Sequence, residues 1–226
     1  MPTGAAPEAV IYRGPASAPG CAEAVAAVLS SGSMPYRCRY IGPQGDRPLS
    51  AEALSSAAIY VQPGGGDDLA AAWRAMRPAA EFLRSWVRGG GVYVGFCMGG
   101  FLAGRNPGFG LLAGDSAEYI KSAGATIDDD GDHLVEIDWK GSSNPMYFQG
   151  GPDFALSPKD AGGVLAHYPN GSIAAMVARF GAGALGVTGP HPEAPASWYR
   201  DAGLVPPNPL PFHCARELVA AARQLL

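Results

Sequence analysis

The stretch Gly91-Val92-Tyr93-Val94-Gly95-Phe96-Cys97-Met98-Gly99-Gly100 decides how this sequence is interpreted. Its apolar part is typical of a buried strand, and two glycines flank a cysteine at the point where a helix should begin. A strand-to-helix turn of this kind, a nucleophile elbow, raises its central side chain above the sheet and directs it at the positive end of the helix. The stretch therefore predicts that Cys97 is a nucleophile. The alternative is an inert buried cysteine.

Segments with strand and helix patterns alternate before the elbow. Apolar or alternating runs predict strands at residues 9–12, 36–41 and 57–61, and helical spacing predicts helices at 21–29 and 69–88, the latter as one or two helices. Strands separated by helices need crossover connections, so the pattern predicts a parallel sheet with helices on both faces. Ligands of such sheets bind beyond the carboxyl ends of the strands, which is where the elbow would lie.

The second half of the chain changes character. Shorter strand-like runs occur at residues 133–139, 146–149, 164–168, 173–180 and 184–188, and an amphipathic pattern over 212–226 predicts a terminal helix. The turns between these runs indicate antiparallel additions to the sheet. The acidic run at 128–132 resembles a calcium loop, but His133 and Trp139 stand where that loop needs glycine and glutamate. We therefore predict a hairpin turn there.

Composition narrows the class of protein. No linker-like stretch divides the 226 residues, so a single domain over residues 1–226 is expected. Only 16% of the residues are charged and the net charge is −4, which argues against nucleic acid as a partner. The first residues, Met1–Gly4, carry no basic segment, and no apolar run is long enough to span a membrane. The four cysteines lack metal-ligand spacing. These features predict a cytoplasmic protein with reduced thiols, no membrane contact and no metal.

A nucleophilic thiol needs a base held by a third polar group. His191 follows a predicted strand, which would deliver it to the same edge of the sheet as Cys97. Glu193 would project to the same side if the flanking prolines keep the backbone extended. The sequence therefore predicts Cys97, His191 and Glu193 as catalytic residues, and the alternative is a proline-rich surface turn. The other three histidines are expected to be structural or exposed.

Backbone N–H groups that hold a developing oxyanion are expected in a glycine loop. Gly64, Gly65 and Gly66 follow the predicted strand at 57–61, and Met98 begins the helix after the elbow. We predict that Gly65 and Met98 donate to the oxyanion, and that Gly64 and Gly66 contribute to substrate binding. Glycine suits this position because no Cβ blocks close approach.

Polar residues near the same edge could line the mouth of the site. Asp67 and Asp68 follow the glycine loop, and Tyr147 and Gln149 lie in a strand that ends at two glycines. We predict Asp67, Tyr147 and Gln149 as substrate-binding residues for a polar or cationic small molecule. The alternative for the two aspartates is that they cap the following helix.

Several motifs together resemble one family. They are Tyr12-Arg13-Gly14-Pro15, Pro63-Gly64-Gly65, the elbow, Tyr147-Phe148-Gln149-Gly150-Gly151 and Thr188-Gly189-Pro190-His191-Pro192-Glu193. The chain is similar, from about residue 9 to about 195, to the N-terminal domain of some biotin–protein ligases and to stand-alone bacterial proteins, within the class I glutamine amidotransferase-like superfamily. The resemblance implies a flavodoxin-like three-layer sandwich and a Cys97, His191, Glu193 triad.

Two departures from the family bear on function. Arg13 stands where the family usually has asparagine, and it either presents a cation to the pocket or turns outward. The sequence contains no biotin-ligase catalytic domain and no ammonia-consuming synthetase domain, so biotinylation is not predicted. The intracellular-protease-like branch of the same superfamily usually has a carboxylate after the first strand that tunes its cysteine, and Arg13-Gly14-Pro15 offers none. Comparison with that branch therefore disfavours a glyoxalase or deglycase-like activity.

We therefore predict a cysteine-dependent amide hydrolase or amidotransferase that forms an acyl-thioester on Cys97 and needs no cofactor. The alternatives are a non-catalytic binding or regulatory module that keeps the pocket, and a redox-sensing thiol. A small molecule is the expected substrate. A homodimer and an unidentified acceptor-domain protein both remain open as partners.

Overall fold

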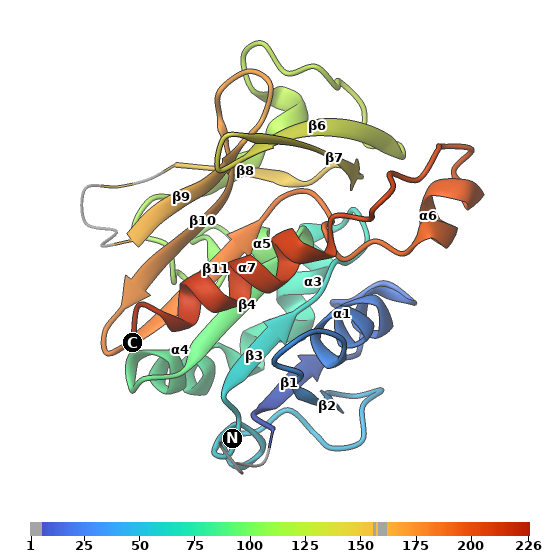
Figure 1. Ribbon diagram of the computed structural model, residues 1–226. Helices are drawn as coiled ribbons and strands as arrows, with labels where there is room; N and C mark the ends of the chain where they lie inside the picture. The colour runs from blue at the N-terminus through green and yellow to red at the C-terminus, as the bar shows by residue number, and fades with distance from the viewer. Residues whose placement is uncertain (1–5, 156, 158–161) are drawn as a thin grey trace.

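The computed structural model describes residues 6–155, 157 and 162–226 (Figure 1). The helices are α1 (Cys21–Ser30), α2 (Ala51–Leu54), α3 (Leu69–Met76), η1 (Arg77–Ala79), α4 (Ala80–Arg88), α5 (Met98–Ala103), η2 (Tyr119–Lys121), α6 (Ala196–Asp201) and α7 (Phe212–Arg223), of which η1 and η2 are short 3-10 helices. The strands are β1 (Glu8–Tyr12), β2 (Arg37–Ile41), β3 (Ile59–Gln62), β4 (Val92–Phe96), β5 (Ser116–Glu118), β6 (His133–Trp139), β7 (Ser142–Phe148), β8 (Pro152–Phe154), β9 (Gly162–His167), β10 (Ile173–Phe180) and β11 (Gly183–Thr188). They confirm the predicted α/β class.

The sheet is parallel on one side. Its strand order is β2-β1-β3-β4-β11-β10-β9-β6-β7, and the pairs from β2 to β11 are all parallel. Strand β11 joins this parallel set although a hairpin from β10 delivers it. Its last residue, Thr188, pairs with Phe96, the last residue of β4. Because the two strands end level, the residues that follow them lie at the same rim of the sheet.

The other side of the sheet is antiparallel, as predicted. Strands β10, β9, β6 and β7 pair in antiparallel fashion, and β8 pairs with β10 and β5 beside this path. The predicted hairpin turn at 128–132 is wrong, because β6 pairs with β7 and β9, both later in the chain. Residues 128–132 are an irregular loop in which Asp129 Oδ1 accepts a bond from the Gly131 N–H at 2.7 Å. Local turn chemistry stabilises this loop without specifying a strand pair.

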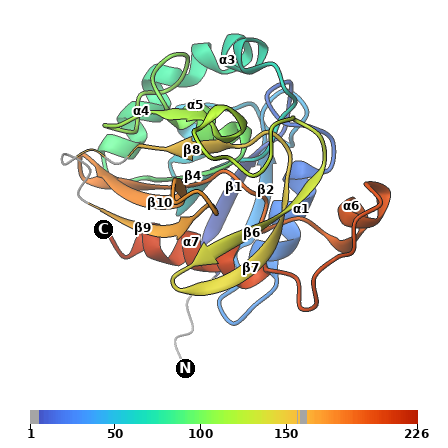
Figure 2. The same cartoon turned by 90° about the horizontal axis from the view of Figure 1, so that it is seen from above.

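Hydrophobic cores lie on both faces of the sheet and make the three layers. Val61 and Val94 point to the face covered by α1 and α7. Tyr60 and Tyr93, their neighbours along the strands, point to the face covered by α3, α4 and α5. Figure 2 shows the two sets of helices on opposite sides of the strands. Side chains of successive strand residues alternate between faces, so these short apolar strands supply both cores.

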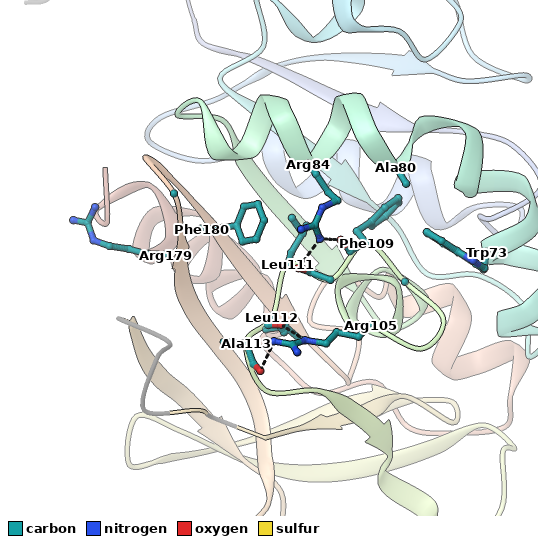
Figure 3. A pocket seen from close by; sticks show the side chains of 13 residues that line it. Trp73, Ala80, Arg84, Arg105, Phe109, Leu111, Leu112, Ala113, Arg179 and Phe180 are labelled. Atoms are coloured by element: carbon teal, nitrogen blue, oxygen red, sulfur yellow. Dashed lines mark hydrogen bonds between the residues drawn. The ribbon is translucent and has the colours of Figure 1, made fainter.

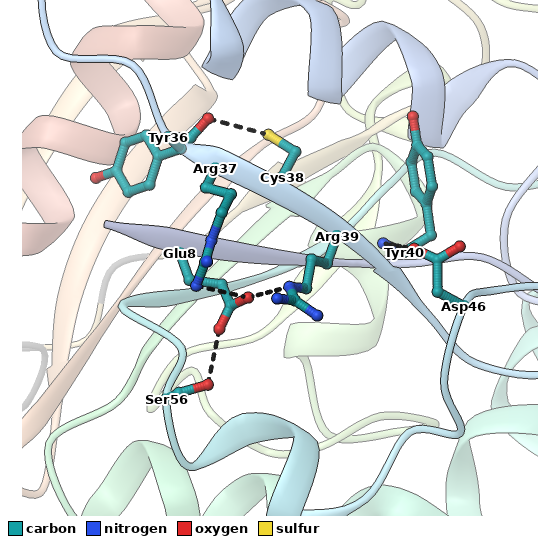
Figure 4. Close-up of polar contacts among 8 residues, drawn as sticks. All are labelled: Glu8, Tyr36, Arg37, Cys38, Arg39, Tyr40, Asp46 and Ser56. Atoms are coloured by element: carbon teal, nitrogen blue, oxygen red, sulfur yellow. Dashed lines mark hydrogen bonds and ion pairs between the residues drawn. The ribbon is translucent and has the colours of Figure 1, made fainter. Parts of the chain in front are cut away.

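A buried carboxylate holds the first strand to the edge strand β2 (Figure 4). Glu8 is 7% exposed, and its Oε1 lies 2.5 Å from Arg39 Nε and 3.4 Å from Arg37 Nη2. Ser56 donates to the other oxygen at 2.7 Å. The arginines place charge on the exposed edge, which discourages pairing with a strand of another molecule.

No helix in the described part of the chain is long and apolar enough to cross a membrane. Residues 1–5, which contain the N-terminal stretch used in the sequence analysis, lie outside the described residues.

Candidate functional site

Cys97 occupies the turn between β4 and α5, with φ 45° and ψ −103°. This backbone conformation is sparsely populated for a residue other than glycine and costs about 1–3 kcal/mol. The turn is closely packed against the end of β3, because a Cβ on Gly99 would lie 2.1 Å from the carbonyl oxygen of Gln62. The Cys97 side chain is buried, and its thiol lies 3.7 Å from the carbonyl oxygen of Gln149. The chain therefore has the strand–turn–helix geometry that an elbow requires.

The neighbouring strand brings His191 to the same rim. The Cys97 N–H donates to the carbonyl of Thr188, the last residue of β11, at 2.9 Å. The His191 N–H donates to the carbonyl of Tyr147 at 2.8 Å, which fixes the histidine between β11 and β7. The elbow is thus bonded directly to the last residue of β11, which shortly precedes His191 in the sequence.

Glu193 contacts the histidine, although the backbone differs from the prediction. Its Oε1 lies 2.8 Å from His191 Nδ1. The predicted extended backbone is wrong, since the Ala194 N–H donates to the carbonyl of His191 at 3.1 Å and closes a turn. Pro192 occupies the second position of this turn, which its ring favours. The turn folds the glutamate side chain back onto the histidine.

The His191 and Glu193 side chains are almost completely buried, at 4% and 1% exposure. Burial lowers the pKa of His191, but the charges of Glu193 and Cys97, with hydrogen bonding to both, outweigh it and raise that pKa to about 10. Within the described residues the second carboxylate oxygen, Oε2 of Glu193, has no hydrogen-bond partner. A buried carboxylate of this kind is tolerated only when a neighbouring charge compensates it. The site therefore favours a positively charged imidazole.

The glycine loop packs directly on these residues. A Cβ on Gly64 would lie 2.7 Å from His191 Cε1, and a Cβ on Gly65 would lie 2.7 Å from Met98 Cγ. The loop approaches the histidine and the start of α5 closely only because side chains are missing there. Gly66 is exposed and has no atom within 4 Å of its Cβ position, so it does not take part in this packing.

Of the residues predicted at the mouth of the site, Tyr147 and Gln149 contact His191 or Cys97, whereas Asp67 is exposed and Asp68 caps a helix. Tyr147 packs its ring edge-on against His191, with ring centroids 5.9 Å apart, and its hydroxyl donates to Asp132. Gln149 has an exposed side chain and contacts the Cys97 thiol through its carbonyl oxygen. Asp67 is exposed, and Asp68 caps α3 by accepting a bond from the Ala71 N–H at 2.8 Å. The capping alternative is therefore correct for Asp68.

Arg13 turns outward. Its guanidinium lies 2.9 Å from Glu23 Oε1 and stacks over the ring of Tyr40, with 45% of the side chain exposed. The arginine therefore forms a surface ion pair, and it does not present its charge to the Cys97 site.

Three residues of this site carry no signal in the sequence. Trp198 and Tyr199 of α6 both pack against Tyr147, Trp198 also packs against His191, and the Tyr199 hydroxyl accepts a bond from the Tyr147 N–H at 3.0 Å. Cys21, the first residue of α1, places its Sγ 3.3 Å from the Cβ position of Gly64. Burial, with the nearby charges of Glu193 and Cys97, raises the pKa of Cys21 far above its usual value. Neither the sequence spacing of these residues nor a motif points to the site.

Metal ligands are not grouped in the described part of the chain, where no cluster of three or more His, Cys, Asp or Glu side chains could hold an ion. All four cysteines are free thiols.

The fold is that of glutamine amidotransferases. A glutamine amidotransferase from Thermotoga maritima superposes with a TM-score of 0.56 at 14% identity over 98% of this chain and 97% of that one. A glutamine amidotransferase from Methylobacillus flagellatus gives 0.53 at 15% identity over 87% and 74%. The exo-β-1,4-mannosidase Op5Man5 from Opitutaceae bacterium strain TAV5 gives 0.55 at 18% identity over 96% of this chain but 36% of that one. Likeness at this level of identity establishes the fold alone, and function has to be argued from the site.

The sequence resembles the biotin–protein ligase N-terminal family over part of its length. The family described as "Biotin-protein ligase, N terminal" matches residues 8–117, which include the elbow and the glycine loop. The match confirms the resemblance found in the sequence motifs. Comparison with the sequences of curated proteins gives no match.

Proposed function

We propose that the protein is a cysteine-dependent amide hydrolase or amidotransferase that acts through Cys97, His191 and Glu193. One observation carries the proposal. A buried histidine, bonded to a buried carboxylate at 2.8 Å, lies at the rim where a cysteine sits on a strained strand-to-helix turn. Nucleophile, base and orienting group are the three parts that acyl transfer needs.

The first half of the proposed reaction forms the acyl-enzyme. The Cys97 thiolate attacks the carbonyl carbon of the amide, and the carbonyl oxygen becomes an oxyanion. Backbone N–H groups of Gly65 and Met98 stabilise that charge. The C–N bond then breaks, the His191 imidazolium gives its proton to the departing amine, and an acyl-thioester remains on Cys97.

The second half releases the acyl group. Water or an acceptor amine attacks the thioester carbonyl while neutral His191 takes a proton from the attacking group. The C–S bond breaks and the thiolate returns. Glu193 accepts the Nδ1–H of the imidazole throughout, which orients the ring and stabilises its charged form. The raised pKa of His191 is consistent with an imidazolium–thiolate pair in the resting enzyme.

The substrate we propose is a small polar molecule, with Gly64, Gly66, Asp67, Tyr147 and Gln149 as binding residues. Tyr147 has the best structural support of these five, since its ring packs on His191 and its hydroxyl is bonded to Asp132. Asp67 and Asp132 would place negative charge near the mouth and favour a substrate with a cationic group. We place the protein in the cytoplasm, with a homodimer or an acceptor-domain protein as candidate partners.

The proposal is tested by trapping the acyl-enzyme. The protein is mixed with glutamine, glutamate γ-esters and a panel of small amides, then quenched in acid and examined by intact-protein mass spectrometry. The expected result is an adduct on Cys97 with at least one compound, absent from Cys97→Ala. His191→Gln should form it more slowly by about 10³-fold or more.

A non-catalytic binding module gives a different outcome in the same experiment. Such a protein forms no adduct with any member of the panel, while a ligand still raises its melting temperature. An adduct on another cysteine, unaffected by Cys97→Ala, would also contradict the proposal. Cys214→Ala is a matched control, because this buried thiol lies in α7 and burial raises its pKa to about 12.

A further inference from the structure

A cavity lies between α4, the loop after α5 and the turn between β10 and β11 (Figure 3). Its volume is about 720 Å³, and its walls include Trp73, Arg84, Arg105, Phe109 and Phe180. Small-molecule sites usually occupy roughly 300–1,000 Å³ and combine apolar walls with a few fixed polar groups. The cavity has the size and the lining of such a site.

The cavity is at the opposite end of the sheet from Cys97. Arg179 pairs in register with Ala184, which pairs with Val92, the first residue of β4. Cys97 follows the last residue of the same strand. Five strand residues span about 16 Å, so the cavity is separate from the Cys97 site.

Two of the three arginines that line the cavity, Arg84 and Arg105, are held in place by the loop after α5. Arg84 Nη1 donates to the carbonyls of Phe109 and Gly110, the latter at 2.7 Å. Arg105 donates to the carbonyl of Leu112 through Nε at 3.3 Å and to that of Ala113 through Nη2 at 2.8 Å. A guanidinium has five N–H donors, so N–H groups remain on each side chain for a ligand. Figure 3 shows Arg84 reaching this loop from α4, while Arg105 belongs to the loop and bonds within it.

No carboxylate of the described residues forms an ion pair with these arginines. Over the described residues, Arg84, Arg88 and Arg105 take part in no ion pair, although the chain as a whole carries a net charge of −4. Asp115, the acid beside Arg105, accepts bonds from the backbone N–H groups of Arg105 and Ser116. Burial and the positive charges of Arg88 and Arg105 lower the pKa of Arg84. A bound anion would relieve this repulsion.

Aromatic rings complete the cavity. Arg84 and Arg88 lie over the ring of Phe180 at 5.1 and 5.2 Å from its centroid. Phe109 packs edge-on against Trp73 at 5.7 Å. Phe109 is buried beneath the cavity, while the partly exposed rings of Trp73 and Phe180 offer an apolar surface next to the fixed positive charges. This combination suits a ligand that is itself part apolar and part anionic.

We propose that this cavity is a binding site for a small organic anion with an apolar body. Arg84 and Arg105 bind the anionic group, and the partly exposed rings of Phe180 and Trp73 contact the apolar part. The site does not depend on the chemistry proposed for Cys97.

The test measures binding by calorimetry at constant ionic strength with phenyl phosphate, which has both an anionic group and an apolar ring. Inorganic phosphate tests the anionic group alone, and benzyl alcohol tests the apolar ring alone. The expected result is saturable binding of phenyl phosphate with a dissociation constant of about 1 mM or below, and binding of each simpler compound weaker by about tenfold or more. Arg84→Gln and Arg105→Gln should each weaken phenyl phosphate binding about tenfold or more, because each removes a charge-assisted bond.

Three further variants keep the test decisive. Arg179→Gln removes the third arginine of the lining, whose side chain points away from Arg84 and Arg105 (Figure 3), so binding should stay within about twofold. Cys97→Ala should also bind normally. Ala80→Trp fills the cavity and keeps both arginines, and it should abolish binding even if Arg84→Gln misfolds. The proposal is overturned by no saturable binding to the wild type, by equal loss in Arg179→Gln, or by loss in Cys97→Ala.

Discussion

The charged side chains at the two ends of the sheet differ in burial and in pairing. At the rim beyond β4 and β11, His191 and Glu193 are buried and compensate each other, and Cys97 is held in a strained backbone conformation. At the other end, Arg84 and Arg105 are partly or largely exposed and bond to backbone carbonyls of one loop. Replacing one member of a buried charged pair leaves the other charge buried without a partner. Replacing a solvated arginine leaves no such buried charge. The comparison predicts large effects at the rim and small ones at the opposite end.

The largest effect is expected for Glu193→Gln. Loss of the carboxylate leaves the His191 ring without its orienting acceptor, so acylation of Cys97 by an activated ester should slow by about 10⁴-fold. Stopped-flow measurement of ester cleavage gives the rate. Glu217→Gln removes a half-exposed carboxylate bonded to Lys140 and should leave the rate within about twofold. A Glu193→Gln rate within tenfold of the wild type would mean that the pair is structural.

Gly99→Ala should cause the next largest change. Its Cβ would lie 2.1 Å from the Gln62 carbonyl oxygen, so the elbow must shift and stability should fall by about 3 kcal/mol. Urea unfolding measures the change. Gly66→Ala lies on the same rim, where the Cβ position is open, and should alter stability by no more than about 0.5 kcal/mol. Equal effects of both substitutions would show that the elbow is not closely packed.

The pH dependence of stability should come mainly from the rim. The pKa of His191 is raised from its usual 6.5 to about 10 in the folded protein. Its contribution is therefore complete below pH 6.5 and is lost as the pH rises towards 10. Thermal unfolding across this range measures it. His191→Gln should flatten the decline, and an unchanged slope in that variant would contradict the assigned pairing.

The smallest effect is expected at the opposite end. Arg84→Gln removes bonds to two backbone carbonyls and should lower stability by about 1 kcal/mol, with ester cleavage at Cys97 within about twofold of the wild type. Urea unfolding measures the change in stability, and stopped-flow kinetics on the same preparation measure the rate of ester cleavage. A tenfold fall in the rate would show that the two ends are coupled, and the contrast between them would then fail.

Patterns that repeat along the chain were predictable from the sequence. The strands, the crossover helices and the parallel-then-antiparallel sheet follow from apolar periodicity and turn residues. His191 could be assigned to the Cys97 rim because a strand delivers it, which depends only on strand direction. Asp68 had two open interpretations, and the structure shows that it is a helix cap.

Other features depend on packing between distant segments. An extended backbone was predicted at 191–194, which is a turn, and a hairpin turn was predicted at 128–132, which is an irregular loop. Both predictions were wrong because local residue preferences do not determine which distant segment a backbone group bonds to. Trp198 and Tyr199 reach the site through a short helix whose sequence has no distinguishing pattern. The arginine cavity was also missed, since its walls come from three separate parts of the chain.

The most direct test of the reactive cysteine is the rate of alkylation by iodoacetamide as a function of pH. Burial raises the pKa of Cys38 to about 11 and that of Cys214 to about 12, so these thiols should react slowly near neutral pH. We predict that one cysteine is labelled rapidly at pH 7, that peptide mapping identifies it as Cys97, and that His191→Gln slows its labelling by at least about tenfold. Labelling of Cys97 no faster than that of an unfolded cysteine peptide, or unaffected by His191→Gln, would contradict the account.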